Sequence, residues 1–193
     1  LLFANGLQGF GAQQSSNDSH ARLPRFEVDL SWQWPPKLPN NWVVGVVTWV
    51  AVDQRDHVWV LHRPRQVPIE IQDRAAPPVL EFDTTGRFVQ AWGGPGEGYD
   101  WPDSNHGIAV DSMDNVWIGG NGADDSHILK FARDGTFLLQ LGSPGMRTGS
   151  NDTENFWRVA KISVDPTANE AYIADGYGNR RVAVLDAGTG EFK

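Results

Sequence analysis

The sequence predicts an all-β fold, and within that class a β-propeller of which about three blades fall in the 193 residues. Two observations carry the prediction: a strand pattern that recurs at a period of more than 50 residues, and turn signals that split each repeat into four short strands. The composition agrees, because nine Trp, nine Phe, 21 Gly and 12 Pro against two Met describe short strands joined by tight turns.

The repeat begins with a short apolar strand that ends in aspartate. Three segments share it, namely Val50–Asp53, Ile108–Asp111 and Ile162–Asp165, and their aspartates lie 58 and then 54 residues apart. Such a long period without the 3.6-residue spacing of helices excludes a helical solenoid. It indicates blades packed around an axis, because a single four-stranded sheet cannot bury both of its faces.

Each repeat continues with three more predicted strands. The second strands are expected at 57–60, 115–118 and 170–173, the third at 79–82, 128–131 and 182–185, and the fourth begins at Arg87 in the first repeat. The third repeat stops within its fourth strand at Phe192–Lys193, and Phe26–Leu30 is expected to add an N-terminal strand. A closed ring needs at least four blades, so we expect an incomplete propeller that is a fragment of a longer protein.

The N-terminus resembles the end of a secretion signal. Leu1–Ala12 is apolar and ends in small residues, and a polar run follows it, as after a signal-peptide cleavage site. The alternative is a mildly apolar, disordered terminus. We therefore divide the chain into residues 1–25, a signal-peptide remnant and disordered lead, and residues 26–193, a partial propeller domain. A secreted or periplasmic location is expected, and no later run is long enough to span a bilayer.

Charge and cysteine content narrow the function. A net charge of −8, with no basic stripe, disfavours a nucleic-acid partner. The absence of cysteine excludes disulfides and thiolate metal sites. A small-molecule or peptide ligand remains the expected partner, and nothing in the sequence defines the oligomeric state.

Three short motifs give the repeats a resemblance to a known family. They are Val50–Asp53 followed by His62 and Arg63, then His106–Asp111, then Ala174–Arg181. The blade pattern resembles NHL repeats, and these motifs, in this order, are similar to those of the peptidyl-hydroxyglycine amidating lyases. The pattern is also similar to that of simple bacterial NHL-repeat proteins of unassigned function.

The resemblance implies specific roles. Arg63 and Tyr177 would be catalytic, His106 would bind zinc, and the backbone carbonyls of Val50 and Ile108 would bind a structural calcium. It also implies a six-bladed full protein. The lyase zinc site needs two further histidines from later blades, and the chain departs from the family pattern in not containing them.

Read without the family, each of these side chains has two interpretations. His106 precedes an inner strand and is either a zinc ligand or a histidine that hydrogen-bonds loop backbone. Arg63 either holds a substrate carboxylate or forms a salt bridge with Asp100 or Asp103. Tyr177 is either a proton acceptor activated by a nearby cation or a packing residue in a glycine-rich turn.

Other residues are expected to be structural. Asp175 and Arg181 are spaced for an ion pair between strands, and Trp59 and Trp117 recur at one repeat position, as expected for packing between blades. Three further histidines are expected to lie outside the site: His57 in solvent, His62 on the face opposite Arg63, and His127 far from the axis.

Two functions follow from this sequence. The first is a secreted NHL-repeat propeller that binds a ligand or a protein at its loop-rich mouth, without assured catalysis; the long segments Gly93–Asn105 and Ser143–Arg158 suit such a surface. The alternative is a zinc-dependent lyase that cleaves the C–N bond of a peptidyl-α-hydroxyglycine into a peptide amide and glyoxylate. The sequence leaves open whether the protein is an enzyme.

Overall fold

The computed structural model describes residues 25–28, 30, 32 and 37–193. The expected signal remnant at Leu1–Ala12 lies outside these residues. Contacts divide the chain into Leu1–Leu30 and Ser31–Lys193, and all strands belong to the second unit. The described part of Phe26–Leu30 forms no strand, so the N-terminal strand expected there is wrong for those residues.

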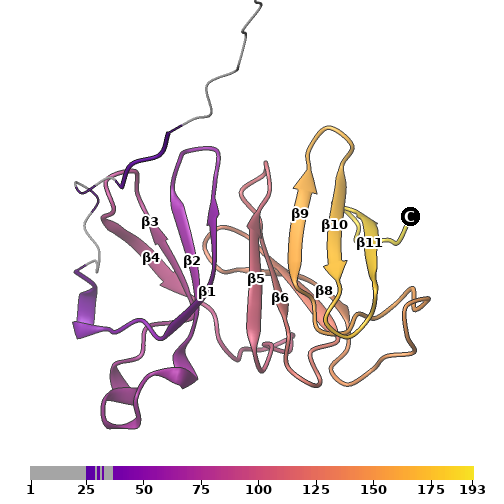
Figure 1. Cartoon of the computed structure of the whole chain (residues 1–193), viewed down its shortest axis with the longest axis horizontal. Helices are drawn as coiled ribbons and strands as arrows, with labels where there is room; N and C mark the ends of the chain where they lie inside the picture. The colour runs from indigo at the N-terminus through magenta and orange to yellow at the C-terminus, as the bar shows by residue number, and fades with distance from the viewer. Residues whose placement is uncertain (1–24, 29, 31, 33–36) are drawn as a thin grey trace, which may run out of the picture. The chain divides into compact units, whose positions relative to one another are not determined.

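Ser31–Lys193 contains three antiparallel sheets in which each strand pairs with the next one along the chain (Figure 1). The first sheet is β1 (Val46–Val52), β2 (Val58–Arg63), β3 (Val79–Phe82) and β4 (Phe88–Trp92). The second is β5 (Asn105–Val110), β6 (Val116–Gly120), β7 (His127–Phe131) and β8 (Phe137–Gly142). The third is β9 (Lys161–Asp165), β10 (Glu170–Asp175) and β11 (Arg181–Asp186).

These sheets confirm the predicted blades. Every strand expected from the repeat is present within a few residues, and the start of a fourth strand in the third sheet is marked by an antiparallel bridge between Leu185 and Phe192. Short 3₁₀ turns, η1 (Pro39–Asn41), η2 (Pro64–Gln66) and η3 (Ile69–Arg74), are the only helical elements of the described residues. The fold is therefore all-β and consistent with an incomplete propeller.

Neighbouring sheets meet through their inner strands. The first strands β1, β5 and β9 contact one another in that order (Figure 1). Apolar side chains from neighbouring sheets pack together in the spaces between them. Trp59 of the first sheet is fully buried against β6 and β7, and Trp117 of the second is fully buried against β10 and β11. The predicted packing of these tryptophans between blades is confirmed.

The repeated aspartate explains why each blade starts as it does. Asp111 accepts hydrogen bonds from the backbone N–H groups of Met113 and Asn115 (2.9 and 2.8 Å), and its second oxygen accepts one from the indole of Trp117 at 3.0 Å. Asp53 does the same for its own turn and for Trp59. The carboxylate thus closes the β-turn and fixes the core tryptophan, which is why one spacing recurs.

The antiparallel order places two kinds of connection at opposite ends of the sheets. At one end lie tight turns of about five residues, such as 53–57 and 111–115. At the other lie the longer connections, which we call the mouth loops: residues 64–78, 93–104, 121–126, 143–160 and 176–180. Any functional side chain at an even-numbered strand's end therefore faces the mouth.

Replacing the turn aspartate is a direct test of this scaffold. Asp111→Ala removes the acceptor for two backbone N–H groups, leaves the buried Trp117 indole unpaired and takes the carboxylate away from the buried Lys130 ammonium, so the free energy of unfolding should fall by about 3 kcal/mol. Asp165→Ala is the matched control, because Asp165 accepts only backbone N–H groups, those of Thr167 and Ala168, and should cost about 1 kcal/mol. Urea unfolding of both variants measures the difference. If both lost the same free energy of unfolding, the contacts of Asp111 with buried side chains such as Trp117 would contribute nothing to stability.

Candidate functional site at the mouth

The structure brings together the three side chains that the sequence singled out. Arg63 ends β2, His106 is the second residue of β5, and Tyr177 lies in the loop between β10 and β11, so each comes from a different sheet and all lie at the mouth. The phenol oxygen of Tyr177 is 3.5 Å from Nε2 of His106, and their rings meet edge to face with centroids 5.4 Å apart.

A β-bulge aims His106 at the mouth. Between the pairs Asn105–Gly120 and Ile108–Ile118, two residues of β5 oppose only Gly119 of β6. Such an extra residue bends a strand and redirects its side chain. The Nδ1 atom of His106 then lies 3.0 Å from the carbonyl oxygen of Ala160 in the next sheet.

That contact defines the chemistry available to His106. A carbonyl can only accept, so Nδ1 carries the proton and Nε2 keeps its lone pair, directed towards Tyr177. The hydrogen bond to loop backbone that the sequence offered as one interpretation is therefore present, and it leaves the second nitrogen available. This is also how metal-binding histidines are usually oriented.

Burial and charge keep His106 neutral. Burial lowers the pKa of its imidazole below the usual 6.5, and the nearby charge of Arg63 lowers it further, against the raising effect of the Ala160 carbonyl. The indole of Trp49, next to a bulge in β1, stands 5.9 Å from the ring and contributes to the shielding. A neutral imidazole is the form that binds metals and accepts protons.

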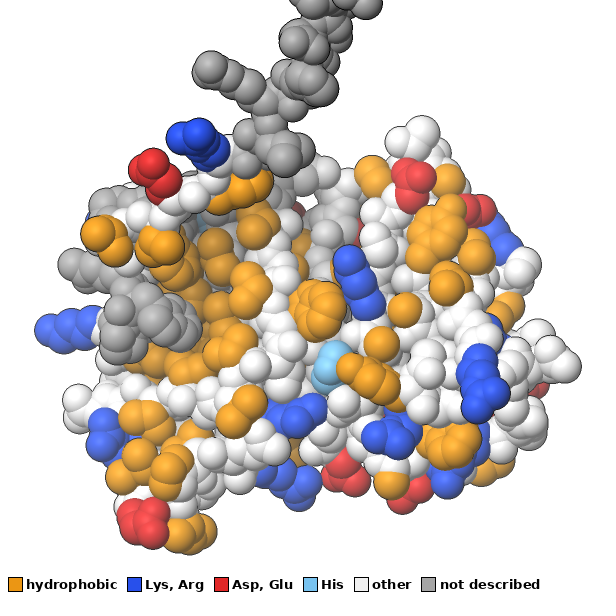
Figure 2. All heavy atoms as spheres, in the orientation of Figure 1, with side chains coloured by type: hydrophobic (Ala, Val, Ile, Leu, Met, Phe, Trp, Pro, Cys, Tyr) orange, Lys and Arg blue, Asp and Glu red, His pale blue; other side chains and the backbone are white. Residues whose placement is uncertain are grey.

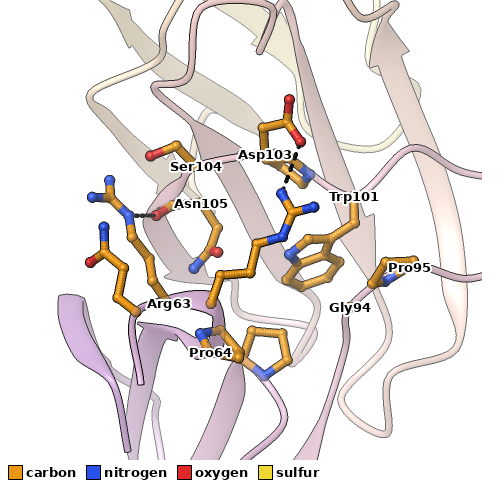
Figure 3. Close-up of a pocket in the computed structure, with 12 residues that line it drawn as sticks. Arg63, Pro64, Gly94, Pro95, Trp101, Asp103, Ser104 and Asn105 are labelled. Carbon is orange, nitrogen blue, oxygen red and sulfur yellow. Dashed lines mark hydrogen bonds and ion pairs between the residues drawn. The ribbon is translucent and has the colours of Figure 1, made fainter. Parts of the chain in front are cut away.

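Arg63 is held by neutral groups only. Its Nε donates to the carbonyl oxygen of Asn105 at 3.3 Å (Figure 3). Its Nη2 donates to Oδ1 of Asn121 at 2.9 Å. No described carboxylate lies within ion-pair distance of its guanidinium; it is the neighbouring Arg65 that pairs with Asp103. The salt-bridge interpretation of Arg63 is therefore wrong.

A cavity of about 230 Å³ opens beside Arg63, between the first and second sheets. Figure 3 shows Arg63 and Pro64 on one wall and Trp101 and Pro95 on another. Its walls come from two mouth loops, residues 64–78 and 93–104. The predicted segment Gly93–Asn105 thus lines a cavity at the mouth.

Tyr177 is positioned by a carboxylate behind it. Asp175 accepts hydrogen bonds from Nδ2 of Asn179 (2.8 Å), from Nε of Arg181 (2.9 Å) and from the backbone N–H of Trp157 (2.8 Å). The predicted Asp175–Arg181 ion pair is confirmed; it joins β10 to β11 across one mouth loop, and the bond from Trp157 ties in a second. Gly178 fits under Trp157, where a Cβ would lie 2.3 Å from the indole, so the turn bearing Tyr177 requires glycine there.

The expected calcium ligands lie on inner strands. Val50 pairs with Val60 and Ile108 with Ile118, so both are in the middle of β1 and β5, which contact each other. Their role remains a prediction. Asn121, which holds Arg63, was missed by the sequence analysis, because no spacing relates it to Arg63 before the sheets are packed.

A second cluster of potential metal ligands lies at the turn end. Single ligand atoms of Asp53, His57 and Glu81 all lie within 4.8 Å of one another. The guanidinium of Arg133 already bonds all three: Nη1 donates to Asp53 at 2.8 Å, and Nη2 contacts Glu81 and lies 3.1 Å from His57. His57 also lies 2.6 Å from Glu81, so its expected exposure to solvent is wrong.

The other histidines are structural. His62 is fully buried, accepting from the backbone N–H of Gly45 and lying 3.0 Å from the carbonyl oxygen of Pro77, on the face of β2 opposite Arg63. His127 is buried at the start of β7, with Nε2 2.7 Å from the carbonyl oxygen of Asp100. In the described residues, no helix has the length and apolar character needed to cross a membrane.

The chain is similar in sequence to two known proteins. No family model matches the chain. It is 29% identical to NHL repeat-containing protein 3 of Homo sapiens over 168 residues, which are 83% of this chain and 43% of the human protein. It is 27% identical to peptidyl-alpha-hydroxyglycine alpha-amidating lyase 1 of Drosophila melanogaster over 170 residues, 77% of this chain and 28% of that protein.

The chain is related to NHL-repeat proteins. The relationship predicted from the three motifs is thereby confirmed, and the chain spans less than half the length of the curated relatives it matches. Among solved structures, the extracellular domain of a putative one-component system from B. thetaiotaomicron matches 76% of this chain and 18% of its own, at 12% identity and a TM-score of 0.43.

The neutral state of His106 can be tested by titration. Because its pKa is lowered on folding, the unfolded chain takes up the proton first as the pH falls below 6.5, so the contribution of this group to stability decreases towards acid pH. Arg63→Gln removes the nearby charge and should raise the pKa of His106. NMR of the imidazole signals measures it; an unchanged pKa in Arg63→Gln would contradict the contact.

Proposed function

We propose that the mouth binds a ligand with a carboxylate group, a small molecule or a peptide, and that Arg63 anchors it. The observation that carries the proposal is the half-buried Arg63 guanidinium, which meets only neutral acceptors, at Asn105 and Asn121. A guanidinium binds carboxylates through paired N–H groups, and Nη1 of Arg63 makes no hydrogen bond to a described atom.

The surroundings of Arg63 suit this ligand. The 230 Å³ cavity beside it gives room for the rest of a small molecule or a peptide end, and the aromatic ring of Trp101 in its wall offers apolar contact. Removing the ligand carboxylate from water is compensated by a cation that is already oriented and partly desolvated. Ligand sites at loop-rich ends of rigid scaffolds follow the same principle.

A second candidate function is zinc-dependent cleavage of a peptidyl-α-hydroxyglycine, and one observation favours it. Nε2 of His106 carries a lone pair and points towards Tyr177, whose phenol oxygen is 3.5 Å away. The motif resemblance and the relative named as an amidating lyase support the same reaction. This lyase activity requires more zinc ligands than the described residues provide.

The fit of zinc to the mouth is partial. A zinc site takes four ligands as a rule, and among the described residues His106 supplies the one partly exposed imidazole at the mouth, since His62 and His127 are buried. The donor cluster found elsewhere, Asp53 with His57 and Glu81, lies at the opposite end and already holds Arg133. Further histidines, from other parts of the protein, are needed to complete a zinc site on His106.

In such a site the chain's own residues have clear tasks. Zinc would act as a Lewis acid at the substrate hydroxyl. Arg63 would hold the carboxylate of the hydroxyglycine, and Tyr177 would accept the hydroxyl proton. The O–H electrons then form the carbonyl of glyoxylate while the C–N bonding pair leaves with the nitrogen, which takes up a proton to give the amide.

Secretion and a six-bladed full protein complete the proposal. The apolar, small-residue run of Leu1–Ala12 supports a secretory signal, and the related repeats support a larger ring. A calcium ion bound by the carbonyls of Val50 and Ile108 belongs to the same proposal. Calorimetry in calcium-free and calcium-loaded buffer is the direct measurement for it.

Binding of a simple carboxylate tests the first function. N-acetylglycine should bind, the neutral N-acetylglycinamide should bind at least tenfold more weakly, and Arg63→Gln should remove the difference. Arg65→Gln is the matched control, because Arg65 lines the same cavity but pairs with Asp103, and it should change the affinity less than twofold. Titration calorimetry measures both; equal binding of the acid and the amide would refute the proposal.

Zinc content and turnover test the second function. The protein at its full natural length should hold one zinc at the mouth, lose it in His106→Ala, and release glyoxylate from a hydroxyglycine peptide. Tyr177→Phe should keep the zinc and lose turnover at least a hundredfold. Zinc binding that is indifferent to His106→Ala would exclude this mechanism.

A further inference from the structure

A second arginine converges on the residue that holds Arg63. Nε of Arg158 donates to the backbone carbonyl oxygen of Asn121 at 2.9 Å, while Nη2 of Arg63 donates to the side-chain oxygen of the same Asn121 at 2.9 Å. The two guanidinium groups are therefore bonded to two oxygens of one residue. They belong to different sheets, Arg63 ending β2 and Arg158 standing three residues before β9.

Arg158 is held there at a backbone cost. Its φ is +62°, in the left-handed region that a long side chain rarely adopts. The other described non-glycine residues with positive φ are asparagines and aspartates, which tolerate this conformation. The backbone N–H of Arg158 donates to the carbonyl oxygen of Asp125 at 2.9 Å, and this contact maintains the conformation. Strain of this kind persists where function requires it.

Neither guanidinium is neutralised. No described carboxylate lies within ion-pair distance of Arg158, and the same holds for Arg63 and for two neighbouring mouth cations, Lys161 and Arg180, which are exposed. Most other described arginines have acidic partners, both at the turn end, as Arg133 does, and at the mouth, as Arg65 and Arg181 do. Figure 2 shows several Lys and Arg side chains in the lower half of the view, where Figure 1 places the mouth loops, with Asp and Glu side chains among them.

This concentration of unpaired cations is unexpected in a chain with a net charge of −8. Acidic groups are abundant, yet no described carboxylate lies within ion-pair distance of Arg63 or Arg158. Two like charges held near one residue repel each other, which costs stability unless an anion joins them. The arrangement thus leaves a place for negative charge from outside the chain.

We infer that Arg158 is a second anion-binding residue of the mouth, so that the ligand is a molecule with two carboxylate groups, such as an acidic peptide end. Arg63 takes one carboxylate and Arg158 the other, with Asn121 holding both cations apart. The inference rests on the proposed function, because it presumes that Arg63 binds the first carboxylate. It adds the positive charge of Arg158, which would make the mouth prefer ligands with two carboxylates over ligands with one.

The discriminating measurement compares ligands with one and two carboxylates. N-acetylaspartate and N-acetylglutamate should bind the unmodified chain, the better of the two at least tenfold more tightly than N-acetylglycine. Arg158→Gly should reduce that preference to less than twofold while leaving the affinity for N-acetylglycine within threefold. Arg63→Gln should weaken all three ligands, since the first anchor is lost.

Thermal melts of the same variants separate ligand binding from a structural role. Glycine adopts a positive φ without strain, so Arg158→Gly should melt at the same temperature as the unmodified chain or higher. Arg158→Asn also tolerates the left-handed backbone and provides a second variant with the charge removed. Arg180→Asn is the control for loss of one mouth charge, and it should change the preference less than threefold.

The outcomes are distinct. If the dicarboxylates bind no more tightly than N-acetylglycine, the second anchor is refuted while the proposed function stands. If none of the three ligands binds, both the proposed function and the second anchor are refuted. A preference that persists in Arg158→Gly and Arg158→Asn, with a lowered melting temperature, would show that Arg158 only supports the loop.

Discussion

Two buried charges determine how neighbouring sheets fit together. Glu81 of β3 and Lys130 of β7 occupy the same position of their repeats, and both are buried. Each is paired with a group of the following sheet: Glu81 with Arg133, and Lys130 with the backbone carbonyl oxygen of Ala187 at 2.7 Å. Within its own sheet Lys130 lies 3.7 Å from Asp111, and Glu81 accepts from Gln90. The contacts from the next sheet complete the pairing of these buried charges, which favours the observed arrangement of the sheets.

The geometry of the mouth depends on this arrangement. Arg63, His106 and Tyr177 come from three sheets. They are far apart in the sequence, so only the packing of the sheets brings them close to one another. The contacts that link them, from Arg63 to Asn121 and from His106 to Ala160, all cross from one sheet to the next. A small shift of one sheet against another would break them together.

The repeat made the fold predictable, since an aspartate that closes a turn and holds a tryptophan leaves a regular signature in the sequence. The convergence of the three site residues followed from the same repeat. What the sequence could not provide was their partners. The bulge that aims His106, the neutral acceptors of Arg63 and the contact between His57 and Arg133 depend on packing between sheets, where residues far apart in the chain meet.

The separation of short turns and long loops at opposite ends has a consequence for how such a chain can change. The turns are constrained by the aspartates and cannot alter in length without disturbing the core. The long connections carry the binding groups and tolerate insertions at little thermodynamic cost. Natural variation, or a deliberate exchange of those connections, can therefore give the same framework a new specificity while its folding remains intact.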